Sequence, residues 1–177
     1  MSKRLCTIVV VSSLALLAPA RAHAQEAGIM LAASAPGAPV VTLDGREVDL
    51  STYIGKRPVV LEFWATWCPL CRQLEGQMQA AREKYADRVT FVSVGVRDNQ
   101  TAEKQRAYAT EKHIGGELVF DRDGKAVAAY KVPHTSYVVV VDRSGHVVYT
   151  GVGTEQNIDA AIAKAFAPAN AMPHDGR

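Results

Sequence analysis

The chain has 177 residues, of which 48% are hydrophobic and 21% are charged, and its formal net charge is +2. This length suits one globular domain with a substantial core, and the hydrophobic fraction excludes a disordered chain. The small net charge argues against a nucleic-acid partner. The single long apolar run lies at the N-terminus, which excludes a membrane protein with several spans, and three cysteines are too few for a disulfide-stapled miniprotein.

The N-terminus has the pattern of a secretory signal peptide. Two basic residues precede an apolar stretch from Leu5 to Ala18, and the small-x-small tripeptide Ala22-His23-Ala24 follows. We expect residues 1–24 to be cleaved before Gln25, which would place the protein in the periplasm or otherwise outside the cytoplasm, with no stable membrane insertion. An uncleaved anchor helix is the alternative, although the apolar stretch is shorter than the about 20 residues that span a bilayer.

The rest of the chain predicts one domain with two loose flanks. Residues 25–39 are rich in Ala, Gly and Pro and are expected to form a flexible leader, and residues 168–177 are expected to form a disordered tail. Residues 40–167 form the predicted domain, because neither an internal repeat nor a change of composition marks a second one.

The first predicted elements are a hairpin, a buried strand and a helix. Residues 40–50 predict the hairpin, because Asp44-Gly45 readily adopts a turn with positive φ. Residues 58–64 are apolar except for Glu62, which is typical of a strand buried on both faces. The helix follows from apolar residues at helical spacing, which are Cys71, Leu74, Met78, Ala81 and Tyr85.

The second half predicts further strands and helices. Residues 89–96 predict a second buried strand, residues 100–112 an exposed helix, residues 117–120 a strand and residues 125–130 a short helical piece. Residues 137–149 predict a clear hairpin around a turn at 142–145.

The last predicted element is a helix with an apolar stripe from Ile158 to Phe166, capped by Thr154 and stopped at Pro168. The order β-α-β-α followed by a hairpin and a helix predicts an α/β fold, in which the first half is parallel with right-handed crossovers.

Cys68 and Cys71 lie three positions apart, after the predicted buried strand and at the start of the predicted helix. Free N–H groups and the dipole at a helix N-terminus stabilise a thiolate. We therefore expect Cys68 to be the attacking nucleophile. Cys71 lies one turn deeper and shielded, and is expected to resolve the mixed disulfide by displacing the substrate thiol. Pro69 fits the first helical turn, where its missing N–H costs nothing.

Other uses of such a pair are weaker. A structural disulfide also fits an exported chain, although so short a loop restrains the unfolded chain little. A zinc site needs about four ligands, and no second cysteine pair exists. Haem attachment would place His directly after the second cysteine, where Arg72 stands. We expect thiol–disulfide exchange with no metal and no other cofactor.

The segment from Pro58 to Cys71 resembles the active-site segment of the thioredoxin superfamily, and with its N-terminal signal the chain is similar to the exported TlpA/ResA branch of thiol–disulfide oxidoreductases. The likeness runs from about Val40 to Phe166. It implies a thioredoxin-like fold, with a central mixed sheet flanked by helices, and reversible exchange with client protein thiols and disulfides. It also implies a membrane thiol electron donor, and many members serve cytochrome c maturation or keep exported proteins reduced.

Glu62 is the next candidate catalytic residue. It stands six positions before Cys68, where thioredoxins carry a buried acid beneath the second cysteine. The resemblance implies that burial raises the pKa of Glu62 and that its carboxyl relays a proton to or from Cys71. A strand with one face in solvent would instead expose Glu62. The TlpA/ResA branch often has an acid three residues after the second cysteine, but Leu74 occupies that position, so this role is not assigned to Glu75.

The chain departs from thioredoxins opposite the dithiol. Thioredoxins place a cis-proline there, and counting back from the turn at 142–145 puts this position at Ser136, whereas Pro133 would take it if the strand were longer. A cis bond before a residue other than proline costs about 3–4 kcal/mol, so we expect a trans bond between Thr135 and Ser136. The loop is then expected to offer an N–H and a hydroxyl near the sulfurs. The residues expected to contact substrate are Trp67, Pro69, Leu70, Thr135 and Ser136.

The sequence therefore predicts an exported thiol–disulfide oxidoreductase, with the resemblance favouring a reductase. The same chemistry in reverse makes a disulfide-forming oxidant, and Pro69-Leu70 does not decide between them. A non-catalytic module, in which the cysteine pair holds a metal or a static disulfide for assembly, is the alternative from a different class.

Overall fold

The protein is represented by a computed structural model that describes residues 28–167. The signal peptide expected at residues 1–24 and the tail expected at residues 168–177 lie outside the described residues. In chain order the elements are β1 (Pro39–Thr42), β2 (Glu47–Asp49), a 3-10 helix (Leu50–Tyr53), β3 (Val59–Trp64), α1 (Pro69–Tyr85), β4 (Thr90–Val96), α2 (Ala102–Glu111), β5 (Glu117–Asp121), α3 (Lys125–Ala129), β6 (Tyr137–Val141), β7 (Val147–Val152) and α4 (Ile158–Lys164).

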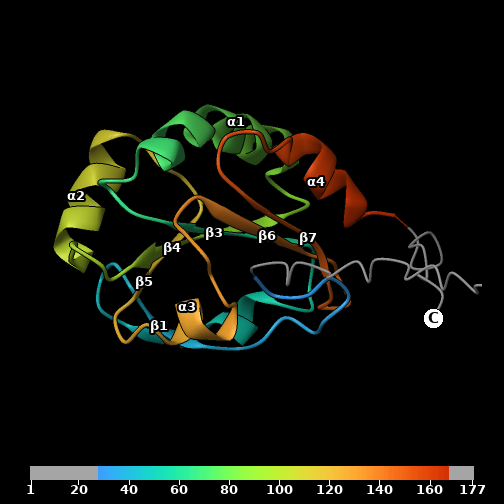
Figure 1. The fold of residues 1–177 in the computed structure, drawn as a ribbon, viewed down its shortest axis with the longest axis horizontal. Helices are drawn as coiled ribbons and strands as arrows, with labels where there is room; N and C mark the ends of the chain where they lie inside the picture. Colours follow the sequence, from blue (N-terminus) through green and yellow to red (C-terminus); the bar gives the residue numbers. More distant parts are fainter. Residues whose placement is uncertain (1–27, 168–177) are drawn as a thin grey trace, which may run out of the picture.

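One mixed sheet with the strand order β2-β1-β5-β4-β3-β6-β7 forms the centre of the domain. Strands β3, β4 and β5 are parallel, whereas β6 is antiparallel to β3, β7 to β6 and β1 to β5. Helices α1, α2 and α4 lie on one face of the sheet and α3 lies on the other (Figure 1). This arrangement is the thioredoxin-like α/β fold that the sequence predicted.

Strand β3 lies at the centre of the sheet and is buried along its whole length. Its side chains alternate between two hydrophobic clusters: Leu61 and Phe63 join the cluster that includes α3, and Val60 joins the cluster beneath α1 and α4. The near-continuous apolar run is therefore that of a strand covered on both faces, as expected. Glu62 is buried within it.

Helix α1 begins directly after the loop that follows β3. Cys68 is its N-cap residue and Pro69 occupies the first turn, where its missing N–H leaves no broken hydrogen bond. The predicted apolar stripe is buried against the sheet and α4, and includes Leu74, Met78 and Tyr85. Tyr85 also stacks on Phe166, just after α4. This packing holds α1 against the sheet along its length and at its C-terminal end, opposite the end that carries the two cysteines.

The expectation of a flexible leader at residues 25–39 is wrong for the part that the structure describes. Ala32 donates a backbone hydrogen bond to Val147 over 2.8 Å, and the N–H of Val147 donates to Ala33 over 2.9 Å. The Tyr130 hydroxyl donates to the carbonyl of Pro36 over 2.8 Å, and Ile29 joins the core. A composition rich in Ala, Gly and Pro predicts a flexible segment, but here the backbone groups hydrogen-bond to residues at the edge of the sheet.

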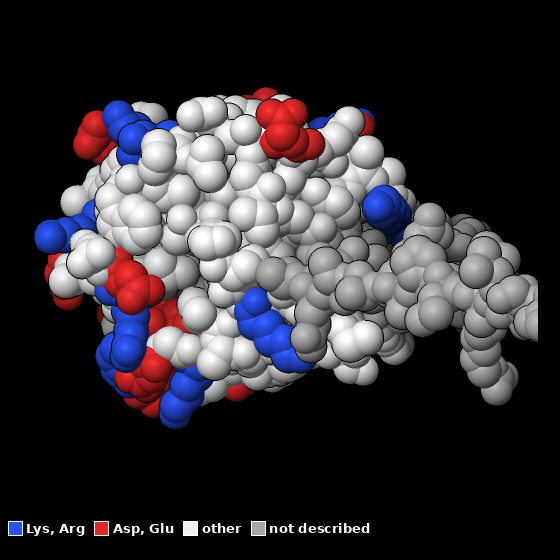
Figure 2. All heavy atoms as spheres, viewed as in Figure 1, with Lys and Arg blue, Asp and Glu red and all other residues white. Residues whose placement is uncertain are grey.

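The last helix starts later than expected. Its N-cap is Asn157, whose side chain accepts a hydrogen bond from the N–H of Ala160, so the expected cap at Thr154 is wrong. None of the helices within residues 28–167 is both long and apolar enough to cross a membrane. On the face seen in Figure 2, acidic and basic side chains are interspersed towards one end, and the middle of this face is mostly uncharged.

Candidate active site

The two cysteines form a disulfide at the N-terminus of α1, with their Cα atoms 5.3 Å apart. The Cys68 sulfur accepts a hydrogen bond from the N–H of Cys71 over 3.1 Å. When the bond is reduced, this N–H and the positive end of the helix stabilise a negative charge on the Cys68 sulfur. The geometry therefore favours Cys68 as the thiolate and Cys71 as its partner one turn deeper.

Both cysteines are buried in the disulfide form, because the exposed fraction is 1% for Cys68 and 4% for Cys71. The expected contrast between an accessible Cys68 and a deeper Cys71 is absent from the disulfide form, in which Cys68 is the less exposed of the two. The side chains that reach the surface beside it are Trp67 and Leu70, which are 45% and 41% exposed, and Pro69 is exposed between them. These exposed side chains form the surface beside the buried sulfur.

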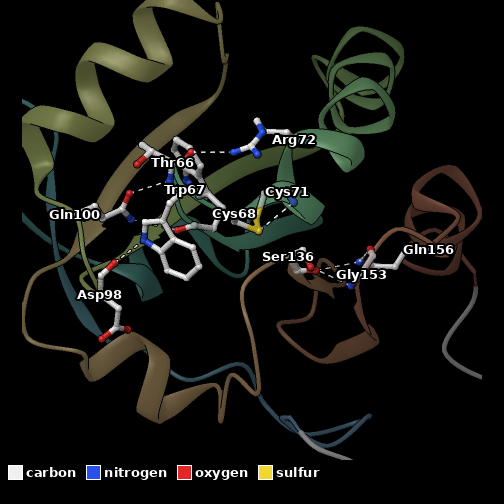
Figure 3. Close-up of a disulfide and its surroundings, with 11 residues drawn as sticks. Thr66, Trp67, Cys68, Cys71, Arg72, Asp98, Gln100, Ser136, Gly153 and Gln156 are labelled. Atoms are coloured by element: carbon white, nitrogen blue, oxygen red, sulfur yellow. Dashed lines mark hydrogen bonds between the residues drawn. A yellow bond between two sulfur atoms is a disulfide. The ribbon is translucent and has the colours of Figure 1, made fainter.

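The loop between β3 and α1 is held in place by Gln100, which sequence reasoning missed. The Gln100 side chain accepts a hydrogen bond from the N–H of Thr66 over 3.0 Å and donates to the carbonyls of Trp64 and Val96 (Figure 3). The indole N–H of Trp67 donates to the carbonyl of Asp98 over 2.7 Å. These contacts orient the exposed Trp67 ring beside the disulfide.

On the opposite side, Ser136 immediately precedes β6, and its neighbour Tyr137 pairs with Phe63 of β3. Residues 28–167 contain no cis peptide bond, so the Thr135–Ser136 bond is trans, as expected. Ser136 has a φ of 63°, a left-handed conformation that is uncommon for residues other than glycine. The chain therefore fills the cis-proline position with a different backbone conformation.

Two hydrogen bonds hold Ser136 in this conformation. Its hydroxyl accepts from the N–H of Gly153 over 3.0 Å, and its carbonyl accepts from the Gln156 side chain over 3.0 Å (Figure 3). Ser136 is fully buried, and Thr135 is half-buried. The Ser136 hydroxyl oxygen, which was expected to lie near the sulfurs, accepts this hydrogen bond from Gly153. Gln156 is a second functional residue that sequence reasoning missed.

Glu62 lies beneath the disulfide with an exposed fraction of 3%, so the alternative of a solvent-facing carboxyl is excluded. Burial is the main cause that raises the pKa of Glu62 from 4.5 to about 8, and the negative charge of Glu75 adds to it, whereas Arg82 opposes it. Glu62 and Cys71 line the same cavity, whose volume is about 260 Å³. Such a cavity has room for water between the two groups.

Among residues 28–167, no group of three or more His, Cys, Asp and Glu side chains has the arrangement of a metal site. The carboxyls of Glu62 and Glu75 line the same cavity as Cys71, and the guanidinium of Arg82 lies between these two carboxyls.

A thioredoxin-like sheet with a Cys-x-x-Cys disulfide at the start of a helix defines the class of thiol–disulfide oxidoreductases. The chain belongs to the Redoxin family, whose model matches residues 30–166. It is 33% identical over 142 residues to the thioredoxin-like protein YneN of Bacillus subtilis, covering 76% of this chain and 82% of that protein.

Two other similarities agree with this assignment. The chain is 24% identical over 144 residues to the thiol–disulfide oxidoreductase ResA of Bacillus cereus, with 80% of this chain and 82% of ResA covered. A secreted disulfide oxidoreductase of Mycobacterium tuberculosis shares the fold with a TM-score of 0.61 at 23% identity, covering 73% of this chain and 96% of that one.

Proposed function

We propose that this oxidoreductase acts outside the cytoplasm, where it reduces disulfides of client proteins and is itself reduced by a membrane thiol donor. The observation that carries the proposal is the disulfide at the N-terminus of α1, with Trp67 and Leu70 exposed beside it. The similarity to ResA supports exchange with protein thiols and disulfides. Export rests on the signal-peptide pattern of residues 1–24.

In the proposed cycle, the Cys68 thiolate attacks one sulfur of the client disulfide and the other client sulfur leaves as a thiolate. Cys71 then loses its proton and attacks the Cys68 sulfur, which releases the second client thiolate and leaves the Cys68–Cys71 disulfide. Two electrons have passed to the client, whose thiolates take protons from solvent. The donor dithiol returns two electrons by the same steps in reverse.

Glu62 serves Cys71 in both directions of this cycle. In the disulfide form its pKa of about 8 keeps the carboxyl protonated at neutral pH. When a donor thiolate attacks Cys68, the Cys71 sulfur leaves as a thiolate and takes this proton through the shared cavity. When Cys71 later attacks the mixed disulfide, the ionised carboxyl takes the proton back.

Reduction of insulin by dithiothreitol tests the activity and the role of Glu62 together. We expect the wild-type protein to accelerate the reaction and Glu62→Gln to slow the opening of the enzyme disulfide at pH 7 by about a hundredfold, because the acid that protonates Cys71 is missing. A wild-type protein without any acceleration contradicts the enzyme and supports a static assembly module. Equal rates for both proteins across the pH range contradict the role of Glu62.

The direction of exchange is tested by the reduction potential measured against glutathione. A potential near that of thioredoxin, about −270 mV, supports the reductase, whereas a value at or above about −150 mV supports a disulfide-forming oxidant. Export is tested by fractionating cells and sequencing the N-terminus of the protein outside the cytoplasm. A mature chain that begins at Gln25 is the expected result, and a protein found only in the cytosol contradicts the proposal.

A further inference from the structure

Arg82, in the last turns of α1, lies between the carboxyls of Glu62 and Glu75. Its Nη1 atom is 2.6 Å from Glu75 Oε1, and its Nη2 atom is 3.7 Å from Glu62 Oε2. The side chains of Glu62 and Arg82 are 4% and 11% exposed, so water screens their charges little, and Glu75 is 26% exposed. One guanidinium therefore lies within 4 Å of two carboxyl groups, and the closer contact is with Glu75.

The two carboxyls do not use all the hydrogen-bond donors of the Arg82 guanidinium. Nη2 is 3.5 Å from the hydroxyl of Ser93, which is opposite Glu62 in the sheet. Nε is buried and has no hydrogen-bond partner among residues 28–167. Arg82 thus has hydrogen-bonding capacity left for a second carboxylate, and the 3.7 Å gap to Glu62 is short enough for a side-chain rotation to close.

Further charged or titratable groups line the cavity that Glu62 shares with Cys71. From α1 the cavity is lined by Cys71, Arg72 and Glu75, and from the far side by Tyr108 and Lys112. Lys112 is paired with Glu111 over 2.8 Å at the surface. Among these groups, Glu75 and Arg82 are the charged ones that act on the Glu62 carboxyl, and they act in opposite directions.

We propose that Glu75 is a positioning residue that holds Arg82 away from Glu62 and thereby keeps Glu62 protonated in the disulfide form. This inference rests on the proposed role of Glu62 as the acid that protonates Cys71. Glu75 competes for the only guanidinium within an ion-pair distance of Glu62 in the described part of the chain. A resting site of one neutral acid, one carboxylate and one guanidinium has no net charge, which suits its burial.

The same arrangement accommodates the next step. When the Cys71 sulfur leaves as a thiolate, the proton of Glu62 moves to it, which yields a Cys71 thiol and a Glu62 carboxylate. Arg82 then lies between two carboxylates, and its guanidinium shifts from Glu75 towards Glu62. Glu75 lines the cavity and is partly exposed to solvent. Water that enters beside Glu75 returns a proton to Glu62.

The two neighbours of Glu62 should shift its titration in opposite directions, which a general loss of packing would not do. The test is the ¹³C NMR titration of glutamate side-chain carboxyls in the disulfide form of the full chain, with Glu62→Gln used to assign the resonance. We expect Glu75→Gln to lower the Glu62 midpoint by about one pH unit, a tenfold change in proton affinity, because Arg82 is released to pair with Glu62. We expect Arg82→Gln to raise it.

Glu83→Gln, on the exposed side of the same helix, is the matched control and should leave the midpoint unchanged. Arg82→Lys keeps a positive charge and covers the case in which Arg82→Gln fails to fold; its midpoint should stay closer to wild type. A midpoint that does not fall in Glu75→Gln, or that falls when Arg82 is neutralised, overturns the inference.

The kinetic arm separates this inference from the proposed function. At pH 7, Glu75→Gln should slow the opening of the enzyme disulfide by dithiothreitol and shift its pH dependence in the same direction as the NMR midpoint. If the midpoints shift as expected while the opening rate does not, the charge competition holds and the catalytic role of Glu62 fails. If the midpoints do not shift, the competition fails even in an active enzyme.

Discussion

The disulfide separates two unlike regions of the molecule. On its outer side, Trp67 and Leu70 are exposed around a buried Cys68 sulfur, and the groups that hold them are uncharged amides and carbonyls. On its inner side, the protonated carboxyl of Glu62 and the positively charged guanidinium of Arg82 are largely buried. Client contact and proton transfer therefore depend on different side chains, and each can be altered without the other.

The largest effects on turnover are expected from substitution of the two cysteines, which have different roles. Cys68→Ser should reduce turnover to the uncatalysed background, because no thiolate attacks the client. Cys71→Ser should also stop turnover but accumulate a mixed disulfide between Cys68 and the client. Non-reducing gel electrophoresis with mass spectrometry checks this, with the double variant as control. Trapping by Cys68→Ser in place of Cys71→Ser would show that the roles are reversed.

The inner region should make stability depend on pH. The pKa of Glu62 is about 8 in the folded protein, against 4.5 for a glutamate in water, so between these values the folded state keeps a proton that the unfolded state has lost. The free energy of unfolding should therefore fall as pH rises through this range, by up to about 1.4 kcal/mol per pH unit.

Denaturant unfolding of the disulfide form at several pH values measures this slope. Glu62→Gln should remove the part of the decline that comes from this carboxyl, because an amide does not titrate. Glu83→Gln is again the control. A slope that is the same in wild type and Glu62→Gln would contradict the buried acid.

A smaller effect, on stability, is expected from substitutions of Ser136. Ser136→Pro should destabilise the protein by about 2 kcal/mol, because proline fixes φ near −65° and the residue stands at +63°. Ser136→Gly keeps the positive φ accessible and should cost less, chiefly the hydrogen bond from Gly153. Thermal unfolding of both variants checks the order, and a proline variant as stable as wild type would contradict the left-handed conformation.

The smallest effect is expected on the outer side. Trp67→Ala should raise KM for a protein client a few-fold while leaving the reduction of a small disulfide and its pH dependence nearly unchanged, because only contact area is lost. Steady-state kinetics with insulin and with a small aromatic disulfide compare the two. A change in pH dependence would show that the two sides of the disulfide are coupled.

The sequence predicted the elements whose signals are local. The apolar run of β3, the helical stripe of α1 and the Asp44-Gly45 turn each depend on neighbouring residues, and the structure confirms all three. Gly45 has a φ of 93°, as this turn requires. The cysteine pair was recognisable for the same reason, since its spacing places both residues on one helical turn.

The sequence could not predict contacts made by residues far apart in the chain. Gln100 bonds to Thr66 over a separation of 34 residues, and Gln156 bonds to Ser136 over 20. The spacing of residues in the sequence does not indicate which backbone group a glutamine side chain will hydrogen-bond to. Arg82 and Glu62 are likewise far apart in the chain, and only the fold shows that their side chains lie 3.7 Å apart.

The segment Ala32–Ala35 has a practical consequence for work on this domain. It hydrogen-bonds to Gly145 and Val147 at the start of β7, which is the last strand of the sheet. A shortened protein that begins at residue 40 leaves these backbone groups bare, and bare strand edges invite pairing between copies. Such a truncated form should aggregate, so material for biophysical measurement is best prepared with residue 28 and its successors retained.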